Sequence, residues 1–105
     1  MAIPSELVNS ILARTSERKL FWQELSSTGF LTHVGETMII VDQMRGGILY
    51  LRIADPSGKV IEEVTASQNE TQLGGLLSDL YESARRQALR VDETLSDLKR
   101  NLDKL

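Results

Sequence analysis

Three short connections, each containing glycine, constrain this chain more than any other feature of its sequence. They are Gly35-Glu36, Arg45-Gly46-Gly47 and Pro56-Ser57-Gly58, and they separate four runs rich in apolar and β-branched residues. Connections this short join antiparallel neighbours, because parallel strands need a crossover of a dozen or more residues. The sequence therefore predicts an antiparallel meander of three or four strands over residues 30–66, with the runs at 30–34, 37–44, 48–55 and 59–66.

The connection lengths also set the register in which these strands pair. The expected pairs are Phe30 with Val41, Val41 with Leu51, Ile39 with Ile53, and Ile53 with Ile61. One face of the sheet is then apolar except for Glu63, and we expect it to form the core: Phe30, Thr32, Val34, Ile39, Val41, Leu49, Leu51, Ile53 and Ile61.

The opposite face of the predicted sheet is unusual because it is not simply polar. It includes Met38, Ile40 and Tyr50, whereas the solvated face of an antiparallel sheet normally carries polar residues. We therefore expect part of this face to be covered, either by the first helix or by another subunit. These three residues are candidates for an oligomer interface.

Polar residues on the same face offer a different interpretation. His33, Asp42, Arg52 and Glu62 share it, and the expected register sets Arg52 opposite Glu62. A cross-strand ion pair between those two is the simplest account. The alternative is a small polar site in which Asp42, His33 and Arg52 act as catalytic groups, which would make the chain an enzyme.

Apolar residues at helical spacing precede the predicted sheet. Pro4 suits a helix start, and the apolar residues that follow predict a helix over residues 4–18. Residues 19–25 fit either a strand or a continued helix, and we favour an extended segment. Trp22, alone in the chain, is interpreted as a packing anchor at the edge of the sheet.

The last third of the chain carries a long amphipathic pattern. After a plausible N-cap at Asn69, apolar or small residues recur at alternating spacings of four and three, with one exception, which predicts a long or bent helix over residues 70–104. The stripe is broad as far as Leu89 and narrow beyond it. The full set is Leu73, Leu77, Leu80, Ala84, Ala88, Val91, Leu95, Leu98, Leu102 and Leu105.

The predicted helical segment is longer than the sheet, so its two halves need different packing partners. A helix of about 35 residues spans about 50 Å, whereas strands of about eight residues span about 27 Å. The distal half, with Val91, Leu95, Leu98, Leu102 and Leu105, must therefore pair with a second copy or bend near Arg90 and fold back, with Asp92 capping a shorter helix. We favour pairing, and hence a homodimer.

A cluster of arginines lies on the proximal half of this segment. Arg85, Arg86 and Arg90 occupy about one and a half helical turns, and Glu82 lies three and four residues before the first two. A salt-bridged surface is the favoured interpretation. The alternative is a patch that binds an anion or an acidic partner.

Composition excludes several kinds of function. The chain has 105 residues, which fits a single α+β domain over residues 1–105, and it has no cysteine and one histidine. Thiolate chemistry and metal motifs with paired histidines are therefore excluded, and we expect no cofactor. A net charge of −3 argues against nucleic-acid binding. The longest apolar run, residues 38–41, cannot cross a membrane and no signal peptide is evident, so we expect a cytoplasmic protein.

One resemblance adds to these expectations. The stretch LLSDLYESARRQAL at residues 76–89, followed by VDETL at 91–95, resembles the C-terminal signature of small uncharacterised bacterial proteins, as do Lys19 and Trp22. That family has the order helix, sheet, helix and no established function. The resemblance therefore implies a bacterial source and this element order, but no chemistry. Arg90 stands where glycine is often found in the family, a substitution that favours a continuous helix.

Three functions remain open at this point. The first is a noncatalytic homo-oligomeric interaction or adaptor module, which the heptad stripe and the mixed sheet face favour. The second is a small acidic protein of chaperone or regulator type, which would capture a protein partner on the apolar part of that face. The third is the enzyme with a small polar site on the sheet.

Overall fold

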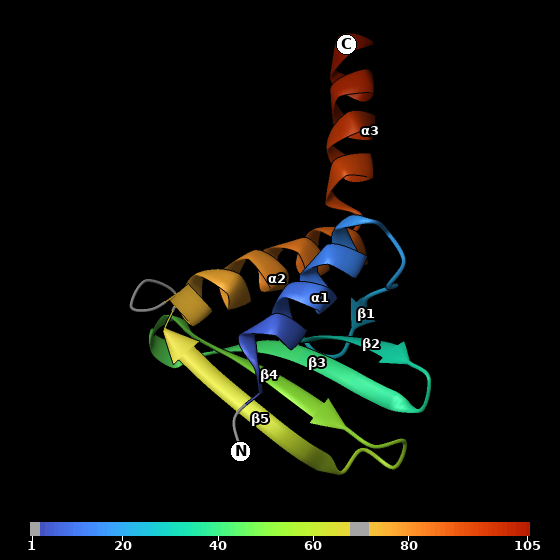
Figure 1. Cartoon of the computed structure of the whole chain (residues 1–105). Coiled ribbons are helices and arrows are strands. Elements are labelled where there is room, and N and C mark those ends of the chain that lie inside the picture. The colour runs from blue at the N-terminus through green and yellow to red at the C-terminus, as the bar shows by residue number, and fades with distance from the viewer. Residues whose placement is uncertain (1–2, 68–71) are drawn as a thin grey trace.

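The computed structural model describes residues 3–67 and 72–105. Its elements in chain order are helix α1 (Ser5–Ser16), strands β1 (Gln23–Glu24), β2 (Phe30–Val34), β3 (Thr37–Met44), β4 (Ile48–Ala54) and β5 (Val60–Ser67), and helices α2 (Gln72–Ala88) and α3 (Val91–Asp103). The predicted α+β class is confirmed. Figure 1 shows α1 and α2 together on one face of the sheet, while α3 projects away from both.

The sheet has five antiparallel strands in the order β1-β2-β3-β4-β5. The predicted registers of β2 with β3 and of β3 with β4 are confirmed, since Phe30 pairs with Val41 and Val41 pairs with Leu51. The connection between β3 and β4 needs glycine, because Gly46 and Gly47 have φ angles of 81° and 77°. Such left-handed angles are costly for residues with a side chain.

The register of β5 differs from the prediction by one residue. An irregularity at the end of β4 pairs Ile53 with Glu62 instead of Ile61. Because side chains alternate between the faces of a strand, this shift exchanges the inward and outward sides of β5. Ile61, expected in the core, is therefore 61% exposed, and Val64 packs against the core in its place.

The segment before the meander supplies a fifth strand that the prediction of three or four strands missed. Residues 19–25 contain no helix, with bends at Leu20 and Leu25, and Gln23 and Glu24 pair with the first residues of β2, as the favoured extended segment requires. Trp22 directly precedes this short strand and is 5% exposed, as expected of a packing anchor. Its backbone N–H donates to Oε1 of Gln87 on α2 at 2.6 Å. A two-residue strand is too short to show an alternating pattern.

The core lies between the sheet and the two helices that share one of its faces (Figure 1). The first helix therefore does not cover the opposite face, and that part of the prediction is wrong. The helices contribute Val8, Ile11, Leu77, Leu80 and Ala84, and the strands contribute Phe30, Ile39, Val41, Leu49 and Leu51.

A buried polar link fixes the end of α1 to the start of the sheet. The hydroxyl of Thr15 donates to the carbonyl oxygen of Ile11 at 2.8 Å and accepts from Nε1 of Trp22 at 3.0 Å. Thr15 is 4% exposed, so both hydrogen bonds are sheltered from water. This link satisfies the indole N–H, which a buried tryptophan requires.

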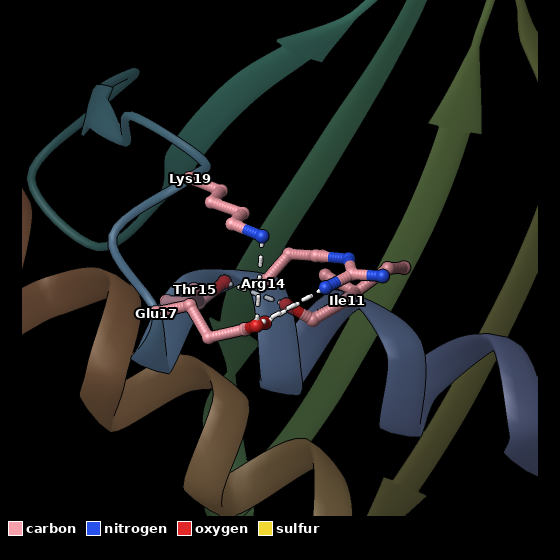
Figure 2. A network of polar contacts seen from close by, with 5 residues as sticks. All are labelled: Ile11, Arg14, Thr15, Glu17 and Lys19. Carbon is pink, nitrogen blue, oxygen red and sulfur yellow. Dashed lines mark hydrogen bonds and ion pairs between the residues drawn. The ribbon is translucent and has the colours of Figure 1, made fainter.

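Just beyond this link the chain reverses direction at the surface. Arg18 has a left-handed φ of 60°, and the N–H of Lys19 returns to the carbonyl oxygen of Arg14 at 2.9 Å. Figure 2 shows the Glu17 carboxylate between the side chains of Arg14 and Lys19, at 2.9 and 3.8 Å. These ion pairs are exposed and contribute little stability, so the buried link determines the geometry here.

The C-terminal segment is bent at Arg90 rather than continuous. Arg90 has φ 54° and ψ 46°, a left-handed conformation that interrupts the helical hydrogen bonding. It is also the N-cap of α3 and forms no side-chain cap hydrogen bond, so the cap predicted at Asp92 is wrong. Nor does α3 fold back, because it projects from the body of a molecule measuring 55 × 32 × 24 Å (Figure 1). Asn69, the predicted N-cap of α2, lies outside the described residues.

Candidate functional site

A stripe of exposed apolar residues follows α3. Leu95, Leu98 and Leu102 expose 53%, 52% and 56% of their surface, and Leu105 just beyond the helix is fully exposed. Val91 is half-buried at the base, and α3 has no buried residue. These five residues, predicted as part of an oligomer interface, form one stripe that we call the α3 seam.

A second candidate surface lies on the sheet face turned away from the helices, which we call the outer face. Met38, Ile40 and Tyr50 lie there and are half-buried. Leu31, from β2, is 8% exposed on the same face. No helix among the described residues covers this face, and α3 leaves the molecule on the other side (Figure 1). The α3 seam and the outer face are therefore separate surfaces.

A polar cluster on the outer face runs across β3, β4 and β5. The hydroxyl of Tyr50 donates to Oδ2 of Asp42 at 2.8 Å, and the guanidinium of Arg52 lies 4.0 Å from the centre of the Tyr50 ring. Arg52 Nε donates to Glu63 Oε2 at 2.5 Å. The predicted ion pair thus forms with Glu63, not Glu62, because the shifted register of β5 brings Glu63 to this face.

Ionisation within this cluster follows its contacts. Burial raises the pKa of Asp42, but hydrogen bonds from Thr28 and Tyr50 outweigh it, so the pKa lies below its ordinary value. Burial and the bond to Asp42 raise the pKa of the Tyr50 hydroxyl. His33, the third residue of the predicted polar site, is exposed near the end of β2. Within the cluster, Asp42, Tyr50, Arg52 and Glu63 are thus linked by hydrogen bonds, an ion pair and a cation–π contact.

The loop before β2 participates in this cluster, which the sequence did not indicate. A Cβ atom at Gly29 would lie 2.7 Å from Oδ2 of Asp42 and 3.0 Å from Oγ of Ser26. Glycine therefore allows the loop to lie against the carboxylate. The loop is also tied to α2, since the hydroxyl of Tyr81 donates to the carbonyl oxygen of Thr28 at 2.7 Å. Gly29 has no pattern around it that would have marked this role.

The arginines predicted to form an anion or acidic-partner patch lie near the bend between α2 and α3. Arg85 pairs with Glu82 at 3.1 Å, Arg86 pairs with Asp92 at 2.5 Å, and Arg90 pairs with Glu93. The hollow beside them is lined by residues of both charges, namely Arg18, Arg86, Arg90, Asp92 and Glu93, together with Thr15, Ser16, Ser83 and Gln87. Anion binding there stays a prediction, and the geometry matches a salt-bridged surface.

Residues 3–67 and 72–105 contain no group of three or more histidine, cysteine, aspartate or glutamate side chains arranged to hold a metal ion. Within the same residues, no helix has both the length and the apolar character needed to span a membrane.

Comparison of the chain with protein-family models, with curated proteins and with solved structures found no match. Two of the surfaces described above carry apolar side chains that the domain does not fully cover: the leucine stripe of the projecting helix α3, and the outer face with Met38, Ile40 and Tyr50.

Proposed function

We propose that this chain is a noncatalytic interaction module that pairs with a second copy of itself through the α3 seam. The observation that carries the proposal is the exposure of Leu95, Leu98 and Leu102 along a helix that packs on no layer of its own domain. Leucine side chains in this spacing are the usual contact surface of paired helices.

Energetics support a partner for α3. An isolated helix shorter than about 12–15 residues is marginal in water, and α3 has 13 residues. Pairing would remove its leucines from water, which contributes about 25 cal/mol for each Å² of apolar surface buried. The same contact would stabilise the helix and associate the two chains.

The test is the molar mass of the full chain in solution. We expect a dimer at micromolar concentration by light scattering, about twice the chain mass of 11.7 kDa, with dissociation on dilution. The apolar seam is the expected cause, so high salt should not abolish the dimer. A monomer mass throughout the micromolar range would contradict the proposal.

A second candidate function is capture of a protein partner on the outer face. The half-buried side chains of Met38, Ile40 and Tyr50 favour it, because solvated sheet faces are normally polar. An extended peptide or an amphipathic helix is the kind of partner that docks on such a surface. This candidate and the dimer are compatible, because the two surfaces are separate.

For this second candidate we expect Ile40→Asp to abolish binding of a partner that copurifies with the chain from its native host. An aspartate in the centre of an apolar contact must be desolvated without a counter-charge. The matched control is Leu7→Asp, at a residue of α1 that is 42% exposed. Retention of the partner by Ile40→Asp, or its equal loss in both variants, would contradict a role for the outer face.

A further inference from the structure

The charges that flank the α3 seam indicate how two copies would pair. A rotation of 100° per residue places Asp92 and Lys99 on one flank of the seam, and places Thr94 and Asn101 on the other. One flank therefore carries opposite charges seven residues apart, and the other flank is neutral. Flanking positions of this kind set the orientation of helix pairs.

Parallel and antiparallel pairs use these flanks differently. In a parallel pair, the charged flank of each helix faces the neutral flank of its partner. In an antiparallel pair, like flanks meet, so that Asp92 faces Lys99 of the partner subunit and Lys99 faces Asp92 of the partner subunit. Only the antiparallel arrangement places opposite charges against each other, and twofold symmetry forms the contact twice.

The apolar layers fit the same register. With Leu95 packed against the partner's Leu98, Val91 packs against the partner's Leu102, and symmetry repeats both layers. Within the single chain Asp92 bonds to Arg86 through Oδ1, and Lys99 bonds to Asp103 at 3.0 Å. Both contacts are exposed, and exposed ion pairs are weak, so they do not prevent new partners from being added.

Resting on the proposed function, we infer that the occupant of the α3 seam is the same helix of a second copy, antiparallel and selected by reciprocal contacts between Asp92 and Lys99. The pairing surface is thus complementary to itself. Such a seam discriminates against parallel helices and against partner helices that lack this charge order.

Charge reversal tests the orientation. Asp92→Lys and Lys99→Glu each set two like charges together in an antiparallel homodimer, so we expect each variant alone to dimerise about three- to tenfold more weakly than the natural chain. Mixed together, the two variants restore both contacts and should form the heterodimer preferentially. Sedimentation equilibrium measures all three constants. A matched control is Thr94→Lys alone, which adds the same charge on the neutral flank, where an antiparallel partner offers no charge, and should leave the dimer constant unchanged.

Cysteine cross-linking gives an independent measure of orientation, because the natural chain contains no cysteine. An equimolar mixture of Val91→Cys and Leu102→Cys is oxidised, and the products are identified by mass. The antiparallel pair predicts the mixed disulfide as the main product. In that pair the two copies of residue 102 lie about 16 Å apart along the axis, too far for a disulfide.

The outcomes separate this inference from the proposed function. A dimer in which two Leu102→Cys chains cross-link to each other, and which shows no preference for the charge-reversed heterodimer, is parallel. That result overturns the inference and leaves the interaction module in place. A natural chain that is monomeric overturns both. The mixed disulfide together with preferred heterodimers supports both.

Discussion

Leu98→Glu is expected to convert the dimer into monomers, raising its Kd by at least about 100-fold, or about 2.7 kcal/mol. Leu98 lies near the centre of the α3 seam, so a symmetric dimer would bury two carboxylates without counter-charges. α3 has no buried residue, so the domain itself should remain folded. Light scattering measures the mass, and far-UV circular dichroism should show a loss of helix no larger than the 13 residues of α3.

Ser96→Glu is the matched control for this substitution. It introduces the same residue into the same helix, on the side away from the seam, where Ser96 is exposed. We expect it to leave the mass unchanged. Equal masses for the two variants, whether dimeric or monomeric, would show that the α3 seam is not the contact between copies.

The division of the C-terminal segment could be predicted from the width of its apolar stripe. The broad stripe before Leu89 belongs to α2, where Leu77, Leu80 and Ala84 are buried, and the narrow stripe belongs to α3, where nothing is buried. A helix packed on a sheet needs a wide apolar face, whereas a helix that meets one other helix needs only a seam. The pattern therefore distinguished a helix packed on the core from one that is not.

The bend between these helices could not be predicted in the same way. Arg90 is a good helix former, and its presence favoured a continuous helix, yet it adopts a left-handed conformation that normally selects glycine. The ion pairs around it link α2 to α3, with Arg86 bonded to Asp92 and Arg90 bonded to Glu93. These ion pairs are exposed and weak, so they accompany the bend without accounting for it, and no residue type at this position marks it.

The pairing of the strands could likewise be predicted only in part. Glycine-containing connections identified the hairpins and fixed the register between β2, β3 and β4, because loop length determines which residues face each other. The register of β5 depends on one irregularity next to Ile53, and no residue type in this part of the sequence indicates it. The predicted register therefore placed Glu62 on the outer face, whereas Glu63 lies there and joins the polar cluster.

Trp22→Ala is expected to destabilise the domain by about 3–5 kcal/mol, the cost typical of removing a large buried aromatic side chain. Trp22 is 5% exposed, packs in the core and donates its indole N–H to Thr15. The substitution would leave a cavity where α1, α2 and β1 meet. Urea unfolding followed by circular dichroism measures the change, in the Leu98→Glu background so that dimerisation does not add to the apparent stability.

A double-mutant cycle separates the packing of Trp22 from its hydrogen bond. Trp22→Phe keeps most of the ring and removes the donor, while Thr15→Val keeps the shape of the threonine and removes the acceptor, so each should cost about 1–3 kcal/mol. Because both remove the same bond, the double variant should cost less than the sum of the two. Additive losses would mean that the bond contributes nothing. A loss below about 1 kcal/mol for Trp22→Ala would mean that the junction does not hold the first helix and the sheet edge together.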